Sequence, residues 1–216
     1  MAKAVKHEKR PYHAPRRAAA AAQTREAILR AAKRRFETRG WAGTTIAQVA
    51  ADANVSPPTI EAVFGTKAAL LADVVDYSIR GDGTNVPMLR REAAQAVEAA
   101  PDAATMLERH AEYSTPISAR SARIARVVES AAGSDKRVAK LWSRMTHNRR
   151  FGARWAAETL LQKPGARPEL TVEDAERIFI IAIDWATHRT LLDELGLSPE
   201  QVKDWTRHYY QRMFLT

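Results

Sequence analysis

The chain has 216 residues, of which 45% are hydrophobic, and this supports one or two globular domains with apolar cores. It contains no cysteine, which excludes disulfides, thiolate metal sites and a cysteine nucleophile. Its formal net charge is +9, and no apolar run is long enough for a signal peptide or a membrane span, so we expect a cytoplasmic protein without membrane contact.

Residues 1–22 form the first segment. They hold six Lys/Arg and one Glu, and therefore more than half of the net positive charge. Such a segment favours a disordered arm that binds nucleic acid, in which Arg16 and Arg17 precede a run of five alanines. A tail that only adds solubility is the alternative.

Four helices are predicted next, over about residues 24–39, 45–51, 56–64 and 67–79. Their apolar residues recur at i, i+3 and i+4, the spacing that places them on one helix face. Gly40 follows the first helix, where a helix C-terminus favours glycine. The sequence Gly81-Asp82-Gly83 then breaks the pattern and divides the body into regions of residues 23–80 and 81–216.

Helical spacing continues through the second region, where Pro101, Pro116, Gly133 and Gly196 separate the segments. The predicted helices cover about residues 87–99, 102–114, 117–132, 135–161, 172–195 and 199–214. No run of alternating polar and apolar residues predicts a strand. The chain is therefore predicted to be all-α, with a small N-terminal and a larger C-terminal helical domain.

The stretch VSPPTIEAVF, residues 55–64, carries two adjacent prolines at the start of the third predicted helix. Proline is tolerated in the first turn because the N–H groups there have no partner within the helix. Ser56 can cap this helix, and Pro57 and Pro58 then stiffen its start. The prolines therefore begin a helix here.

The second and third helices fit a helix-turn-helix motif. Ala50 is small enough for the two backbones to cross closely, and Asn54 lies where the turn requires a positive φ. Apolar residues are expected to hold the inner faces together, namely Val49, Ala53, Val55, Ile60 and Val63. This joint match predicts DNA binding.

Residues 24–75 resemble the DNA-binding domain of TetR-family transcriptional regulators. The shared features are Thr24-Arg25, Phe36, Arg39-Gly40-Trp41, Thr44-Thr45-Ile46, Val49-Ala50 and the spacing Phe64-x-x-Lys67-x-x-Leu70-Leu71. The resemblance implies an all-α homodimer with N-terminal DNA-binding domains and larger C-terminal domains for effector binding and dimerisation. It also implies repression of transcription that a small molecule relieves.

The resemblance assigns DNA contacts by position. Thr44 and Thr45 would meet phosphate at the start of the second helix, and Lys67 would do so from the start of the fourth. The groove-facing side of the third helix would present Thr59, Glu61 and Ala62.

Two departures from the family pattern affect these contacts. The recognition helix of the family usually begins Ser-Lys-Gly-Thr, whereas Pro57 and Pro58 here remove two N–H donors that could bind phosphate. Glu61 replaces a phosphate-contacting phenol with a carboxylate. Either DNA repels this carboxylate, or the carboxylate reads a base by accepting a hydrogen bond from cytosine N4. The basic arm can supply the lost affinity through the minor groove.

An effector cavity is expected in the C-terminal region. Its predicted lining residues are Met106, Tyr113, Trp142, Met145, Phe179 and Asp184. Asp184 interrupts an apolar run, so it either serves an effector pocket or dimer seam or forms an internal pair with His188. The excess of Lys/Arg over residues 120–154 either attracts an anionic effector or forms a solvated helix face.

The last two predicted helices are expected to form an isologous homodimer contact. Their apolar residues are Ile178, Phe179, Ala182, Trp185, Leu192, Val202, Trp205, Tyr209 and Phe214. The sequence thus predicts a ligand-responsive repressor that binds double-stranded DNA at a near-palindromic operator. A ligand-independent architectural DNA-binding protein is the alternative. No catalytic, cofactor-binding or metal-binding motif occurs, so an enzyme is not expected.

Overall fold

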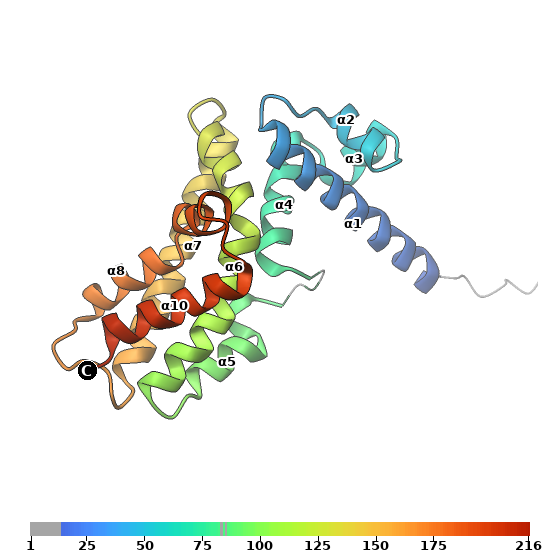
Figure 1. Cartoon of the computed structure of the whole chain (residues 1–216). Helices are drawn as coiled ribbons and strands as arrows, with labels where there is room; N and C mark the ends of the chain where they lie inside the picture. Colours follow the sequence, from blue (N-terminus) through green and yellow to red (C-terminus); the bar gives the residue numbers. More distant parts are fainter. Residues whose placement is uncertain (1–13, 83, 85) are drawn as a thin grey trace, which may run out of the picture.

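The computed structural model describes residues 14–82, 84 and 86–216, which form a series of packed helices (Figure 1). The N-terminal helices are α1 (Ala14–Arg39), α2 (Ile46–Asp52), α3 (Pro57–Phe64) and α4 (Lys67–Arg80). The middle of the chain forms η1 (Met88–Arg90), α5 (Glu92–Glu98), α6 (Ala103–Ala131) and α7 (Lys136–Leu161). The last elements are α8 (Val172–Ala182), α9 (Trp185–Arg189), the π-helical turn η2 (Thr190–Glu194) and α10 (Pro199–Phe214).

The described residues contain no β-strand, and their one β-bridge joins Ala166 to Leu215 as an isolated pair. The prediction of an all-α fold is therefore confirmed. The helices α1–α4 lie together at one end of the molecule, and α5, α8 and α10 lie at the other (Figure 1). The long helices α6 and α7 connect the two ends.

The first helix begins at Ala14, well before its predicted start at residue 24. The prediction of a disordered arm over residues 1–22 is therefore wrong for residues 14–22, and residues 1–13 lie outside the described residues. Alanine has the highest helix propensity, and a helix that already exists gains one hydrogen bond for each added residue. The alanine run consequently extends α1 as an exposed helix beyond its neighbours (Figure 1).

Helix α6 runs through Pro116, where the sequence pattern predicts a break between two helices. Proline lacks the N–H that would bond the carbonyl four residues earlier, here that of Glu112. Both Glu112 and Pro116 are exposed, so water can bond this carbonyl. The buried face of α6 meets its neighbours before and after the proline, and this packing keeps the helix continuous.

The single helix predicted over residues 172–195 is three elements. Helix α8 ends at Ala182, and Asp184 caps α9 by accepting from the N–H groups of Ala186 (2.9 Å) and Thr187 (3.3 Å). Aspartate is among the best N-cap residues, and here it starts a helix rather than interrupting one. The predicted Asp184–His188 pair does not form, because His188 Nε2 lies 3.1 Å from the carbonyl oxygen of Ala182.

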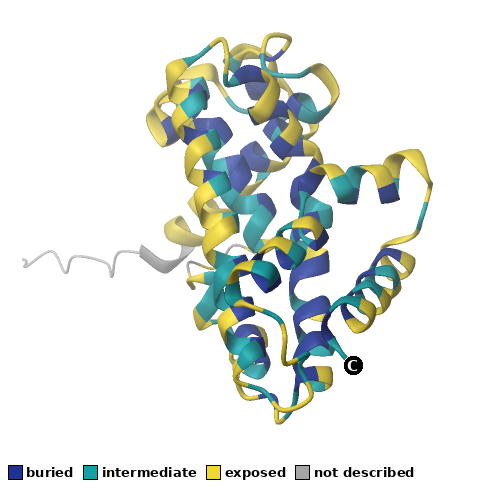
Figure 2. Cartoon of the chain, turned by 90° about the vertical axis from the view of Figure 1, so that its left-hand side faces the viewer, coloured by how far each residue is buried: buried dark blue, intermediate teal, exposed yellow. Residues whose placement is uncertain are grey.

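Two apolar clusters fill the interior, and Figure 2 shows the buried residues on the inner sides of the helices in dark blue. The first joins α1–α4 to the C-terminal half of α6, the N-terminal half of α7 and Trp185. The second lies among α5, α8, α10 and the opposite halves of α6 and α7. Helix α4 thus packs both with the N-terminal helices and with α6, so the break at Gly81 does not separate the apolar interior.

Five residues predicted for the dimer contact are instead buried in the core of their own chain. They are Phe179, Ala182, Trp185, Val202 and Phe214, none more than 7% exposed. A helix pattern shows which residues are apolar but not whether the covering surface belongs to the same chain. The remaining four, Ile178, Leu192, Trp205 and Tyr209, keep partial exposure.

Candidate nucleic-acid interface and ligand cavity

The turn between α2 and α3 depends on Asn54, which adopts a φ of 54°. This left-handed conformation is costly for most residues, and asparagine tolerates it best after glycine. The turn is closed by a hydrogen bond of 3.0 Å from the N–H of Val55 to the carbonyl oxygen of Ala50. The prediction of a helix-turn-helix with a positive φ at this position is confirmed.

Helix α3 starts as its sequence predicts. Ser56 is the N-cap and accepts from the N–H of Thr59 (3.3 Å), and the two prolines occupy the first two helical positions. The Ser56 and Thr59 hydroxyls also lie 2.8 Å apart. Ile60 is fully buried against the motif, but Val63 is 43% exposed, so its predicted place on the inner face is wrong.

The two threonines before α2 differ in accessibility. Thr45 is exposed and caps α2 in a capping box, in which its hydroxyl accepts from the N–H of Gln48 and the Gln48 side chain accepts from the N–H of Thr45. Thr44 is fully buried and donates its hydroxyl to the carbonyl oxygen of Gly40 (2.8 Å). A phosphate contact by the Thr44 side chain is therefore contradicted, because the chain that precedes α2 covers it.

The outer face of α3 presents few charges. Glu61, Ala62 and Val63 are exposed on it, and Thr59 is half-buried. No Lys or Arg occurs between Arg39 and Lys67. This face therefore combines one carboxylate with small apolar groups, and cations that attract DNA must come from other parts of the molecule.

Lys67 holds the first residues of α4 against the loop before α2. Its ammonium donates to the carbonyl oxygens of Trp41 (2.8 Å) and Thr44 (2.9 Å), and it lies 4.0 Å from the centre of the Trp41 ring. Burial lowers the pKa of this ammonium below its ordinary value. These contacts leave one N–H of the ammonium for a phosphate, and the phosphate contact stays a prediction.

Two ion pairs tie α1 to the helices around the motif. Arg35 donates to both carboxylate oxygens of Asp52 at the end of α2 (2.7 and 2.9 Å). Arg25 pairs with Asp73 of α4 at 2.8 Å and lies 4.5 Å from the centre of the Phe64 ring of α3. Ion pairs of this kind fix the orientation of α1 relative to its neighbours, which matters here because α2 and α3 are short.

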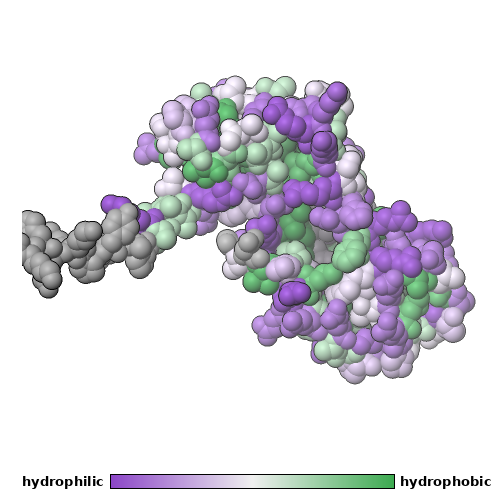
Figure 3. Space-filling view, turned by 180° about the vertical axis from the view of Figure 1, so that it is seen from behind, coloured by the Kyte–Doolittle hydropathy of each residue, from purple (hydrophilic) through white to green (hydrophobic). Residues whose placement is uncertain are grey.

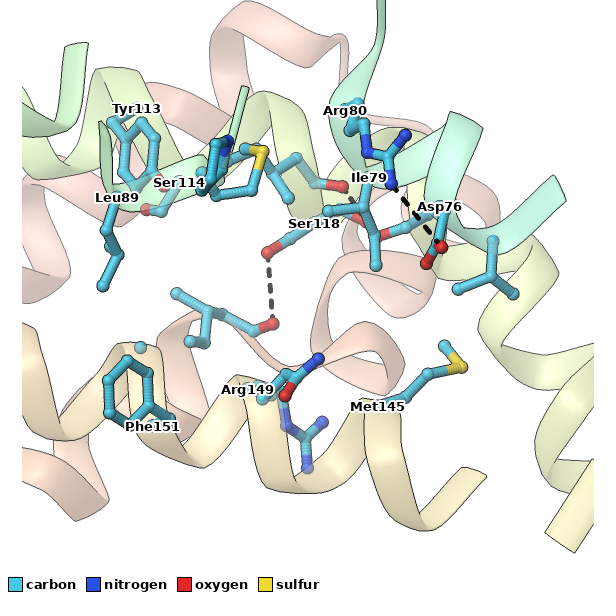
Figure 4. Close-up of a pocket in the computed structure, with 18 of the residues that line it drawn as sticks. Asp76, Ile79, Arg80, Leu89, Tyr113, Ser114, Ser118, Met145, Arg149 and Phe151 are labelled. Atoms are coloured by element: carbon cyan, nitrogen blue, oxygen red, sulfur yellow. Dashed lines mark hydrogen bonds and ion pairs between the residues drawn. The ribbon is translucent and has the colours of Figure 1, made fainter. Parts of the chain in front are cut away.

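A cavity of about 620 Å³ lies among α4, η1, α6 and α7 (Figure 4). This volume is typical of small-molecule sites. Its ionic lining residues are Asp76, Arg80, Arg144 and Arg149, and its other polar groups include His110, Tyr113, Ser114 and Ser118. Its apolar lining includes Ile79, Leu89, Ile117, Met145, Phe151 and Trp155. Seen from behind, hydrophobic residues gather in the hollow between the two ends of the molecule (Figure 3).

The six residues predicted to line an effector cavity have different positions. Tyr113 and Met145 do line it. Met106 and Phe179 are fully buried in the second apolar cluster and do not reach it, so their assignment is wrong. Trp142 packs against the first cluster beside Trp185, with 5.6 Å between ring centres, and is also absent from the lining. Asp184 is absent from the lining and pairs with Arg149.

Sequence patterns did not identify Asp76 or Arg80, and they indicated Arg144 and Arg149 only as part of the basic stretch of residues 120–154. Asp76 and Arg80 belong to the helix that follows the recognition helix, whereas Arg144 and Arg149 come from α7. No local pattern joins them, because only the packing of α4 beside α7 brings them to one cavity. Gly152, also missed, lines the cavity, and a Cβ added there would have no heavy atom within 4 Å.

The end of the cavity near α6 is polar but uncharged. Burial lowers the pKa of His110 to about 3, so the ring is neutral at pH 7, and its Nδ1 lies 3.0 Å from the Tyr210 hydroxyl. Burial raises the pKa of Tyr113 to about 12, which keeps this phenol protonated. Ser118 donates to the carbonyl oxygen of Ile183 (3.1 Å, Figure 4).

The part of the chain that the structure describes lacks two other kinds of feature. None of its helices combines the length and apolarity that a bilayer crossing requires. It also holds no group of three or more His, Asp or Glu placed to bind a metal ion.

A helix-turn-helix with an exposed second helix defines a DNA-binding protein. The family model for bacterial regulatory proteins of the tetR family matches residues 28–74, from α1 to α4. Residues 28–74 therefore form a DNA-binding domain of the TetR family of transcriptional regulators, and the chain binds DNA through this motif. No curated protein matches the chain.

Solved structures share the fold over most of both chains. A transcriptional regulator of Saccharomonospora viridis in complex with choline is 18% identical, with a TM-score of 0.67 over 90% of this chain and 98% of that chain. NalD of Pseudomonas aeruginosa, the secondary repressor of the MexAB-OprM multidrug efflux pump, is 17% identical, with a TM-score of 0.66 over 89% and 98%. A ketosteroid transcriptional regulator of Mycobacterium tuberculosis is 16% identical, with a TM-score of 0.63 over 89% and 95%.

Proposed function

We propose that this regulator is a homodimeric, sequence-specific repressor that a small molecule in the cavity releases from its operator. The observation that carries the proposal is that α4 forms one wall of the cavity and begins three residues after α3 ends. Lys67, at the start of α4, also bonds the loop before α2. A ligand that displaces α4 would therefore displace the recognition helix.

The proposed DNA contacts follow the exposed residues of the motif. Thr45 contacts phosphate at the start of α2, and Glu61 and Ala62 face the major groove with Thr59 at their edge. Lys67 offers its remaining N–H to phosphate. Arg16 and Arg17, near the start of α1, add contacts that do not depend on sequence.

Specificity requires two copies of the motif, because one recognition helix covers only a few base pairs. Two such helices fit a near-palindrome when they lie about 34–36 Å apart. The partly exposed residues of α8 and α10, among them Ile178, Trp205 and Tyr209, supply apolar surface for an isologous contact. Ile181 on α8, which is 53% exposed, enlarges this surface.

The relatives support a ligand-responsive repressor. One regulator of the same fold is crystallised with choline, and another is named as a repressor. The lack of a catalytic motif and of a described bilayer-crossing helix agrees with a cytoplasmic regulator. The alternative is a ligand-independent architectural protein. The cavity does not support this alternative, because one of its walls is α4, the helix that follows the helix-turn-helix.

The DNA half of the proposal is tested by selecting bound sequences from a random pool and sizing the complex. We expect one near-palindromic consensus occupied by two chains. Selection without a consensus would favour the architectural alternative, and one chain on a single half-site would exclude the dimer.

The ligand half is tested with Gly152→Trp, which places a large side chain in the open space beside Gly152. Compounds that lower DNA affinity of the wild type should lose this effect in Gly152→Trp and keep it in the control Gly152→Ala. DNA must in turn weaken the binding of the same compounds by the same factor. A compound that releases both variants equally would place the effector site elsewhere.

A further inference from the structure

The cavity has an ionic end that carries more positive than negative charge. Asp76 of α4 is shared by two arginines, at 3.7 Å from Arg80 and 3.5 Å from Arg144. Both distances exceed those of a strong charged hydrogen bond, so neither guanidinium is fully satisfied. Both arginine side chains keep 35% or more of their exposure. They are therefore accessible to a further anionic group.

The third arginine of the lining is more strongly engaged. Arg149 pairs with Asp184, whose other carboxylate oxygen caps α9, and its guanidinium lies 4.6 Å from the centre of the Trp185 ring. The ionic lining thus holds three guanidiniums and one carboxylate, and Asp184, outside the lining, balances the charge of Arg149. His110 and Tyr113 add no charge at neutral pH, because burial keeps both neutral. The excess charge is positive.

The other end of the cavity is uncharged and rich in aromatic side chains. Figure 4 shows Leu89, Tyr113 and Phe151 at the end away from Asp76 and Arg80. Phe151 is 61% exposed although it is a large aromatic side chain, and Trp155 lies one turn further along α7. The Tyr113 hydroxyl has no hydrogen-bond partner among the described residues. A ligand that spans the cavity would therefore meet cations at one end and apolar rings at the other.

We propose that the effector is an anionic amphiphile, an organic acid whose carboxylate binds Arg80 and Arg144 and whose apolar part lies against Leu89, Phe151 and Trp155. This inference rests on the proposed function, in which the cavity is the effector site. The carboxylate competes with Asp76 for its two arginines. Since Asp76 and Arg80 both belong to α4, this exchange of partners acts on the helix that adjoins the recognition helix.

The same charges distinguish this cavity from a site for a quaternary ammonium ion. Aromatic rings alone would also suit a cation. Arg80 and Arg144 would repel one, and they share a single carboxylate, that of Asp76, while Arg149 is already paired with Asp184. Ligands with equal apolar chains but different charge should therefore bind with different affinities.

The test uses decanoate, decanol and decyltrimethylammonium, each below its micellar concentration, with titration calorimetry as the readout. Decanoate is expected to bind at least tenfold more tightly than the other two. Arg144→Gln should remove most of this preference. The control Arg137→Gln alters an exposed arginine of the same helix outside the cavity and should leave it unchanged.

Asp76→Asn gives a second variant with the opposite expected sign. It removes the carboxylate that competes with the ligand, so decanoate should bind several-fold more tightly, provided that circular dichroism shows a retained fold. Three results would each overturn the proposal of an anionic amphiphile. The three probes could bind with equal affinity, decanoate could fail to bind, or Arg144→Gln and Asp76→Asn could change the affinity for decanoate in the same way.

DNA titration with the same probes separates this inference from the proposed function. If decanoate binds as predicted but leaves DNA affinity unchanged, the proposed release of DNA by the ligand is contradicted, whereas the proposed ligand class is retained. Release of DNA by decanol or decyltrimethylammonium, abolished in Gly152→Trp, would support the switch and overturn the ligand class. Release by decanoate, lost in Arg144→Gln, is the result expected.

Discussion

The helix-turn-helix and the C-terminal helices of this chain are specified in different ways. In the first, each helix start is set by a neighbouring residue: Thr45, Ser56 and Thr66 each cap the helix that follows them. In the second, neighbouring residues also cap the helices, but α6 continues through Pro116 because its buried face packs against other helices on both sides of the proline. Local signals thus describe the DNA-binding unit well, whereas packing among distant segments has a larger share in shaping the C-terminal helices.

The largest expected effect is on the C-terminal core. Phe179 is fully buried and lies 4.5 Å from the Phe214 ring centre and 5.1 Å from that of Tyr210. Phe179→Ala should lower the free energy of unfolding by about 3–5 kcal/mol, as measured in urea, because the cavity it leaves cannot be refilled. DNA affinity of the folded fraction should stay unchanged. A loss of affinity in folded protein would show that the recognition helix depends on this distant core.

Acid should also act through the C-terminal helices, because residues 23–80 contain no histidine. Burial lowers the pKa of His110 from 6.5 to about 3 and that of His188 to about 4. Both rings are neutral in the folded protein. Their contribution to the free energy of unfolding is therefore complete above the unfolded pKa of 6.5 and is lost as the pH falls below that value. From pH 6.5 to 5 His110 alone should cost about 2 kcal/mol.

Urea unfolding at several pH values measures this loss. His110→Asn should reduce the pH dependence, and the exposed residue His208 gives a control variant, His208→Gln, that should not. A wild-type stability that does not change between pH 7 and 5 would contradict the neutral, buried state of His110.

The turn of the motif offers a smaller but local effect. Asn54→Val should cost about 1–2 kcal/mol, because a β-branched residue resists a positive φ, whereas Asn54→Gly should be tolerated. DNA affinity should fall in the valine variant alone. Thermal unfolding and DNA titration measure the two effects, and equal behaviour of both variants would show that the turn does not depend on this conformation.

The smallest expected effect is a gain in stability. Gly152 lies inside α7, where alanine is favoured over glycine by about 0.5–1 kcal/mol, and its added methyl would meet no atom within 4 Å. Gly152→Ala should therefore raise the melting temperature slightly without closing the cavity. A lower melting temperature would indicate that the cavity wall needs a glycine.

The sequence alone determined the helix-turn-helix. Asn54, Ser56 and the two prolines act on the backbone within a few residues, and such short-range effects are visible in the order of residues. The same locality explains the success of the all-α prediction, since helical spacing is a property of one segment. The alanine run also acts locally, and its helix propensity outweighs the charge of the N-terminal segment from Ala14 onward.

Only the tertiary structure decided which apolar residues are internal and where the cavity lies. Phe179 and Phe151 are both aromatic residues on helices of the C-terminal region, yet one is fully buried and the other is 61% exposed at the cavity. Asp76 and Arg144 are far apart in sequence, and the packing of α4 against α7 makes them a pair. Burial and pairing depend on what covers a residue, and that covering comes from segments that no local pattern identifies.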